Sequence, residues 1–274
     1  MTFWEAFFCG LIQGLTEFLP VSSSGHLALA HTLFGMETEA SHLSFDILLH
    51  LATLIVVFVV YHRDVFALIP AFFTMPMKFL KSKFRVDALS EPERMVLLLI
   101  VATVPLIGAF FVKDRLEWIG GYARLVGLLL VLNGLLLLAA DRFPKKRNGA
   151  SLSLKGAFGT GLFQLLATLP GISRSGATIS GGMLFGLSRE NAVKFSFLMS
   201  VPAIIGANIF NLPEALCVSV SARELGCYAV GMLAAMVSGF GAMKFLSYIS
   251  AKEKFGCFAY YCIAIGAVVF VWMN

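Results

Sequence analysis

The first of two similar turns reads Gln13-Gly-Leu-Thr-Glu17-Phe-Leu-Pro20-Val-Ser22-Ser23-Ser24-Gly25-His26. The second reads Gln164-Leu-Leu-Ala-Thr168-Leu-Pro170-Gly-Ile-Ser173-Arg174-Ser175-Gly176-Ala177-Thr178. The glutamines and the Ser-X-Ser-Gly runs of the two turns coincide at an offset of 151 residues. Each turn joins two short apolar stretches, which predicts a re-entrant helical hairpin. Irregular backbone at membrane depth is tolerated only beside protein or a water-filled cavity, so we expect both hairpins to line a cavity.

The composition predicts a polytopic membrane protein. Of the 274 residues, 58% are hydrophobic and 14% are charged, whereas an average soluble domain is roughly 25% charged. This excludes a disordered chain and argues against a soluble enzyme. We attribute the net charge of +5 to basic cytoplasmic loops and predict no nucleic-acid partner. The first residues carry Glu5 and no lysine or arginine, so we predict no signal peptide.

Six segments have about the 20 apolar residues that a helix needs to cross the hydrocarbon core. We predict transmembrane helices over residues 43–62, 95–112, 121–141, 195–213, 225–243 and 255–273. Five further apolar stretches are too short or too broken to span: residues 6–19 and 27–35, residues 156–169 and 176–187, and residues 65–77, which contain Pro70 and Pro76. The first four of these form the arms of the two hairpins.

Lysine and arginine concentrate in residues 78–94, 142–147 and 244–254, which predicts that these loops are cytoplasmic and that both termini lie outside. We predict one integral membrane domain, 1–274, with internal repeats 1–141 and 152–274. Each repeat has one hairpin and three spans. Three spans are an odd number, so the repeats must insert with opposite topology. The expected fold is an all-α inverted-topology repeat, whose site lies where the broken helices converge.

The turns offer serine hydroxyls, backbone N–H groups and helix N-termini, which together suit an anion such as a diphosphate. The expected phosphate-binding residues are Gln13, Ser22, Ser24, Gly25, Ser173, Ser175, Gly176 and Thr178. The alternative is that serine and glycine merely cap helices and form turns. Arg174 favours phosphate because its guanidinium matches phosphate geometry, although it could instead form a structural salt bridge with Glu17.

Glu17 and His26 in the first hairpin are candidates for acid–base work, nucleophilic attack or metal binding. Gln13 lies one helical turn before Glu17 and should share its face. Ser23 is a rival nucleophile to His26. Asp46 and His50 lie four residues apart on one helix face; we favour a structural role for them over one bordering the cavity.

At these residues the sequence resembles the undecaprenyl-diphosphate phosphatase family, also called the bacitracin-resistance family. The first matching element is (Glu/Gln)xxxGlu, here Gln13 to Glu17, followed by Pro20-Val-Ser-Ser-Ser-Gly-His26. The second is Pro-Gly-x-Ser-Arg-Ser-x-x-Thr, here Pro170 to Thr178. The resemblance runs along the whole chain. Another lipid-phosphatase family with a PSGH element is disfavoured because its last motif would need histidine where Ser180 stands.

The resemblance implies an enzyme that hydrolyses undecaprenyl diphosphate to undecaprenyl phosphate and inorganic phosphate. This reaction recycles the lipid carrier for peptidoglycan and confers bacitracin resistance. It also implies Mg²⁺ or Ca²⁺, and a site facing the outer side of the bacterial inner membrane. Because the family's first motif position is Gln13 here, the metal could ride on the diphosphate, with Glu17 as a ligand.

The sequence leaves several alternatives open. Inverted repeats with broken helices are also a transporter signature, so a prenyl-phosphate flippase is the competing function. The nucleophile could be His26, Ser23 or water, and the chain could act alone or as a homodimer among the membrane lipids. Most cysteines are expected to be buried thiols, but Cys217 and Cys227 flank one loop and could pair.

Overall fold

A computed structural model of the protein describes residues 1–33, 40–83, 85–142, 152–216, 221–252 and 255–272. These residues fold into helices. The first half contains α1 (Phe3–Phe18), α2 (Ser23–Leu33), α3 (Ala40–Val60), α4 (His62–Lys81), η1 (Val86–Ala88), α5 (Glu91–Thr103), η2 (Val104–Val112), α6 (Lys113–Gly120) and α7 (Ala123–Asp141). The second contains α8 (Leu154–Leu166), α9 (Arg174–Leu184), α10 (Arg189–Leu216), α11 (Ala222–Ala251) and α12 (Gly256–Trp272).

All six segments predicted to span a membrane are helical over most of their length. Within the described residues, 4 helices are long and apolar enough to cross a membrane: Glu91–Ala109, Ala123–Asp141, Arg189–Asn211 and Ala222–Ala251. A fifth candidate is the pair Ser44–Val60 and His62–Lys81, which bends by 95°. Gly256–Trp272 is apolar but shorter. The helices therefore fit a polytopic membrane protein, while the number of six spans stays a prediction.

Residues 65–77, predicted to be too short or too broken to span, lie in one continuous helix that is a candidate span only together with α3. Pro70 and Pro76 both lie inside α4, which continues α3 after a bend at Tyr61. A proline removes one hydrogen bond from the preceding helical turn without always ending a helix in a membrane.

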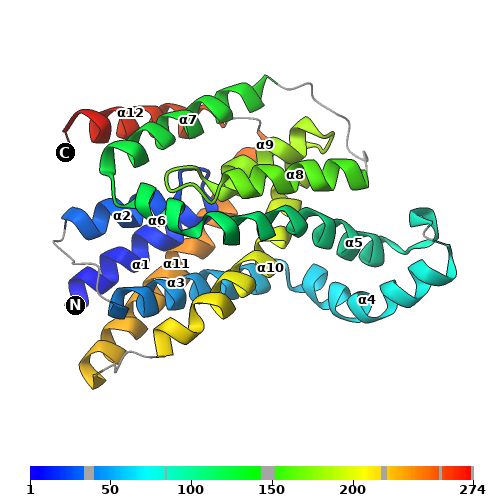
Figure 1. The fold of residues 1–274 in the computed structure, drawn as a ribbon, viewed down its shortest axis with the longest axis horizontal. Helices are drawn as coiled ribbons and strands as arrows, with labels where there is room; N and C mark the ends of the chain where they lie inside the picture. The colour runs from blue at the N-terminus through cyan, green and yellow to red at the C-terminus, as the bar shows by residue number, and fades with distance from the viewer. Residues whose placement is uncertain (34–39, 84, 143–151, 217–220, 253–254, 273–274) are drawn as a thin grey trace.

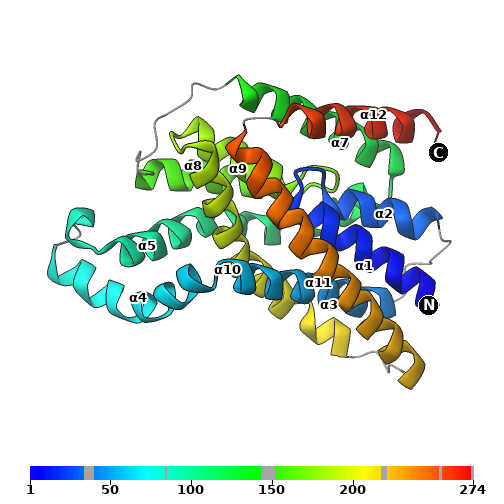
Figure 2. The same cartoon turned by 180° about the vertical axis from the view of Figure 1, so that it is seen from behind.

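The two predicted hairpins are present and point at each other. Helices α1 and α2 form one, α8 and α9 form the other, and their turns meet in the middle of the molecule (Figure 1). Helix α1 starts at the end that carries both chain termini, whereas α8 starts at the opposite end, near the connection between α4 and α5 (Figures 1 and 2). The hairpins thus enter the structure from opposite ends.

Each hairpin packs against the opposite half of the chain through glycine. A Cβ atom at Gly10 of α1 would lie 2.1 Å from the Gly231 carbonyl oxygen of α11. A Cβ atom at Gly161 of α8 would lie 2.2 Å from the Ala102 carbonyl oxygen of α5. Small residues of this kind let helix backbones approach closely in a membrane. These contacts fix both hairpins and so position the turns.

Candidate active site

The two turns are built alike because a serine caps each short helix. The Ser22 hydroxyl oxygen accepts a hydrogen bond from the Gly25 backbone N–H at 3.3 Å, and Ser173 does the same for Gly176 at 3.1 Å. Capping of this kind satisfies an N–H group that has no carbonyl partner inside the helix. The next residues, Ser23 and Arg174, then begin α2 and α9.

Glu17 lies between these two first residues. Its Oε2 atom accepts hydrogen bonds from the Ser23 hydroxyl at 2.7 Å and from the Gln13 amide at 3.0 Å. Its Oε1 atom forms an ion pair with the Arg174 guanidinium. The Glu17 side chain is only 2% exposed, whereas Arg174 keeps 24%. The structure therefore brings four predicted residues into one contact group and confirms that Gln13 and Glu17 share a helix face.

The remaining serines of the turns are mostly engaged in holding the turns together. Ser175 exchanges a hydrogen bond with Ser173 at 3.0 Å and donates to the Leu19 carbonyl oxygen of the other turn at 3.2 Å. Thr178 donates to the Arg174 carbonyl oxygen at 2.7 Å. Ser24 is exposed, with its hydroxyl 3.4 Å from that of Ser22. Capping and turn formation, the alternative to phosphate binding, is thus part of what these residues do.

The glycines of the turns allow the two turns to touch. A Cβ atom at Gly25 would lie 3.3 Å from the Gly171 Cα atom, and one at Gly176 would lie 3.3 Å from the Pro20 Cβ atom. Gly171 itself has a φ of +109°, a conformation that strains other residues. Gly25 and Gly176, predicted as phosphate-binding residues, therefore also serve the contact between the turns.

His26 faces a different neighbour from the other catalytic candidates. Its Nδ1 atom lies 2.8 Å from the Ser22 carbonyl oxygen and its Nε2 atom 2.9 Å from the Tyr261 hydroxyl, and the two rings stack with centroids 5.7 Å apart. These contacts occupy both ring nitrogens. The described contacts of Glu17 do not include His26, so the structure does not join it to the Glu17–Arg174 pair.

His50 lies closer to the candidate site than the sequence led us to expect. Its Nε2 atom lies 3.8 Å from Glu17 Oε2, so it borders the site, contrary to the purely structural role that we favoured. Its other nitrogen, Nδ1, lies 2.8 Å from the Asp46 backbone oxygen, whereas the Asp46 carboxylate lies 3.8 Å from His31. The Asp46 and His50 side chains therefore do not form the pair that their spacing allows.

Asn133 of α7 is a site residue that sequence reasoning missed. It is fully buried, and its side chain contacts Pro20 in the first turn and Ser173 in the second. The available signal was an amide among the apolar residues at the centre of a predicted span. Cys9, Cys227 and Cys262 are buried as expected, but Cys257 is exposed, and Cys217 lies outside the described residues, so its pairing with Cys227 stays untested.

The site fits a divalent cation only with help from substrate. Among the described residues, no three His, Cys, Asp or Glu side chains gather to hold a metal. Glu17 is the nearby carboxylate, and both its oxygens already have partners. The Gln13 Oε1 atom is buried beside it and has no hydrogen-bond partner within the described chain. A hard cation could thus meet two protein side chains, and phosphate oxygens would have to complete its shell.

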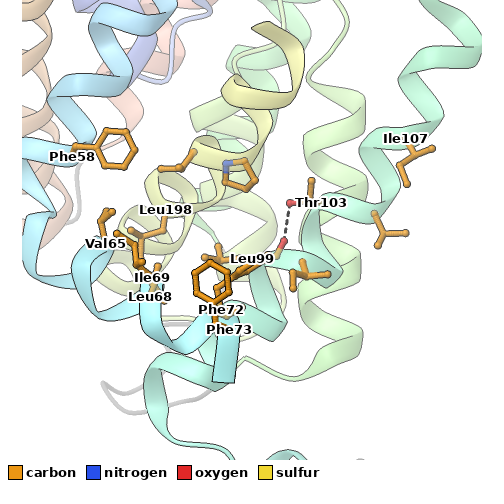
Figure 3. Close-up of a pocket in the computed structure, with 15 residues that line it drawn as sticks. Phe58, Val65, Leu68, Ile69, Phe72, Phe73, Leu99, Thr103, Ile107 and Leu198 are labelled. Atoms are coloured by element: carbon orange, nitrogen blue, oxygen red, sulfur yellow. Dashed lines mark hydrogen bonds between the residues drawn. The ribbon is translucent and has the colours of Figure 1, made fainter. Parts of the chain in front are cut away.

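A separate apolar pocket of about 700 Å³ lies among α3, α4, α5, η2 and α10 (Figure 3). Its lining includes Phe58, Phe72, Leu99 and Leu198. The hydroxyl of Thr103 in its wall is taken by the Leu99 carbonyl oxygen at 2.7 Å. The pocket can hold hydrocarbon, but its lining offers no acid, base or cation for chemistry.

Fold and site together define a multi-pass helical membrane protein with a carboxylate–guanidinium pair between two buried turns. Residues 6–268 match the family model described as bacitracin resistance protein BacA. A protein of Rubrobacter xylanophilus named undecaprenyl-diphosphatase is 42% identical, over 97% of this chain and 96% of the relative. Proteins with the same name from Alkaliphilus metalliredigens and Methanobrevibacter smithii are 41% and 38% identical, over 99% and 97% of this chain and 99% and 96% of the relatives. The chain belongs to the BacA family.

Proposed function

We propose that this protein hydrolyses undecaprenyl diphosphate to undecaprenyl phosphate and inorganic phosphate. The observation that carries the proposal is Glu17, held between Ser23 and Arg174 in a chain of the BacA family. A buried carboxylate bonded to a hydroxyl can activate it, and an adjacent guanidinium suits a phosphoryl group. Such hydrolysis regenerates the lipid carrier for peptidoglycan and removes the diphosphate that bacitracin sequesters.

In this mechanism the diphosphate lies between the two helix N-termini, and Arg174 moves from Glu17 to the phosphate oxygens. The Ser23 oxygen attacks the terminal phosphorus while its proton passes to Glu17. The bond from that phosphorus to the bridging oxygen breaks, and undecaprenyl phosphate leaves. Water then hydrolyses the phosphoserine. The 2.7 Å hydrogen bond from Ser23 to Glu17 favours this route over attack by His26, whose ring nitrogens have other partners. Phosphoryl transfer depends mostly on such positioning and charge stabilisation.

A divalent cation, Mg²⁺ or Ca²⁺, belongs to this proposal as a companion of the diphosphate. Bound there, it would neutralise charge on the phosphate oxygens. Gln13 Oε1, which has no partner within the described residues, and Glu17 are the protein atoms that would hold it. Ser22, Ser24, Ser173, Ser175 and Thr178 remain candidates for phosphate contact once substrate rearranges their hydroxyl groups.

The same proposal includes an inverted-topology repeat. Two observations support it: the hairpins enter from opposite ends (Figure 1), and their glycine contacts are exchanged between halves. Gly10 and Gly161, which form those contacts, stand 151 residues apart, the offset of the two turns.

The basic loops further favour insertion in the bacterial inner membrane with both termini outside. We place the site on the outer side, with the prenyl chain among the membrane lipids, and leave a homodimer open.

Purified protein in detergent provides the test. Wild type, Glu17→Gln and the control Glu190→Gln, which changes an exposed glutamate, are given a prenyl diphosphate with Mg²⁺, Ca²⁺ or EDTA, and phosphate release is followed. Multiple turnover by wild type and the control, but not by Glu17→Gln, supports the phosphatase. Wild type that binds the lipid yet releases no phosphate would instead favour a prenyl-phosphate flippase, which the opposed hairpins would also suit.

A further inference from the structure

Asn133 joins the two turns that form the site. Its Nδ2 atom donates to the Pro20 carbonyl oxygen of the first turn at 3.0 Å. Its Oδ1 atom accepts from the Ser173 backbone N–H of the second turn at 3.0 Å. One buried amide thus uses its donor on one hairpin and its acceptor on the other, and it sits on α7, which belongs to neither.

Both backbone groups need this partner because of where they lie. Pro20 follows the end of α1 and Ser173 precedes the start of α9, so neither the Pro20 carbonyl nor the Ser173 N–H can pair inside its helix. A buried backbone group without a partner costs free energy comparable to a lost hydrogen bond. An apolar residue at position 133 would leave both groups without this bond, and the two turns would lose their common tether.

The tether acts close to the chemistry. Pro20 lies three residues after Glu17, and Ser173 lies directly before Arg174. A shift of one turn against the other would therefore change how Arg174 and Ser23 face Glu17. A titratable group in contact with Asn133 is Cys262 of α12, whose Sγ atom lies 3.4 Å from Nδ2 and donates to the same Pro20 carbonyl at 3.7 Å.

We propose that Asn133 is a positioning residue for the hydrolysis: its amide fixes the spacing of the two turns, and thereby the alignment of Glu17, Ser23 and Arg174. The inference rests on the proposed function. It predicts that the residue at position 133 must accept a hydrogen bond on one side and donate one on the other. Volume and burial alone will not replace it.

Two replacements separate this role from simple packing. Asn133→Leu keeps the branched shape of four side-chain heavy atoms, in a somewhat larger volume, and loses both hydrogen bonds. Asn133→Asp keeps the acceptor for Ser173 N–H. When ionised, its carboxylate opposes the Pro20 carbonyl oxygen; when protonated, its O–H can donate to that oxygen and restore both bonds. Asn208→Asp, the same change on α10, is the matched control.

The measurement is phosphate release from a prenyl diphosphate by each folded protein in detergent, across pH, expressed relative to wild type at the same pH. We expect Asn133→Leu to lower kcat at least tenfold at every pH, with a smaller change in KM. We expect Asn133→Asp to recover toward wild type as pH falls, while Asn208→Asp stays at a constant ratio.

Equal turnover of Asn133→Leu and wild type would overturn the inference. So would recovery at low pH in Asn133→Leu, or a folded Asn133→Asp whose turnover stays well below that of wild type at every pH. A wild type that releases no phosphate would refute the proposed function itself, which is a different outcome from any of these.

Discussion

Replacing Arg174 with alanine removes the guanidinium that joins the second turn to Glu17 of the first. In the proposed reaction this group binds phosphate oxygens and offsets the charge that develops on them. Loss of one such preorganised donor typically costs about 2.7–4 kcal/mol, or roughly 100- to 1000-fold in turnover. We therefore expect Arg174→Ala to lower turnover at least about 100-fold. Arg174→Lys keeps the charge but loses the planar fork, so its turnover should lie between those of wild type and Arg174→Ala.

The same change also affects stability, and the structure sets its scale. Breaking a fully buried ion pair costs about 3–5 kcal/mol, but the Arg174 side chain keeps 24% exposure. Glu17 also retains its hydrogen bonds from Ser23 and Gln13. We therefore expect a stability loss of about 1.5–3 kcal/mol, the range for a hydrogen bond to a charged group. The variant should fold, so its turnover can be measured per folded molecule.

The assay compares initial rates of phosphate release for wild type, Arg174→Ala and Arg223→Ala, with thermal unfolding of each sample measured in parallel. Arg223 is an exposed arginine on α11 and controls for the loss of a positive charge. A folded Arg174→Ala protein whose turnover stays within a few-fold of wild type would refute the assignment. Because Arg174 and Glu17 act as a pair, the double variant with Glu17→Gln should have a turnover only a little below that of the less active single variant.

Three further outcomes are expected. Ser23→Ala should abolish turnover and any trapped phosphoenzyme, whereas His26→Gln should keep a phosphoserine that mass spectrometry detects. A phosphohistidine in the wild-type protein would reverse the assignment. Gly10→Leu should lower the thermal unfolding temperature sharply, because its Cβ atom would lie 2.1 Å from the Gly231 carbonyl oxygen. The control Gly206→Ala adds a Cβ atom with nothing within 4 Å and should leave that temperature unchanged. Equal unfolding temperatures of the two variants would contradict the packing. Calorimetry should show weak Mg²⁺ binding to the protein alone although EDTA stops turnover, and tight binding without diphosphate would argue for a protein-built metal site.

The sequence predicted the helices and the hairpins because their signals are local. The apolar stretches have the length of a membrane span, and Pro, Ser and Gly at both turns mark where a helix must stop and restart. The pairing of Gln13 with Glu17 follows equally from helical spacing. Pro70 and Pro76 suggested a break that α4 does not have, because whether a proline ends a helix depends on the structure around it and not on the sequence alone.

The contacts across the chain could not be predicted in the same way. His50 reaches Glu17 from another helix, and Asn133 reaches two turns from a third. No periodicity or residue spacing in the sequence predicts either contact. The repeat placed the turns of Glu17 and Arg174 near each other, but it left open whether the two side chains would form an ion pair.

The exchange of helix partners between halves has a consequence for biogenesis. Helix α1 leaves the ribosome first, yet the surface that receives Gly10 belongs to α11, near the end of the chain. Glu17, at the end of the same helix α1, is also synthesised long before its partner Arg174 on α9. During translation its carboxylate has to stay hydrated, neutral or shielded by the insertion machinery. The completed site is a late product of assembly, and a chain truncated before α9 would carry the Glu17 carboxylate without its Arg174 partner.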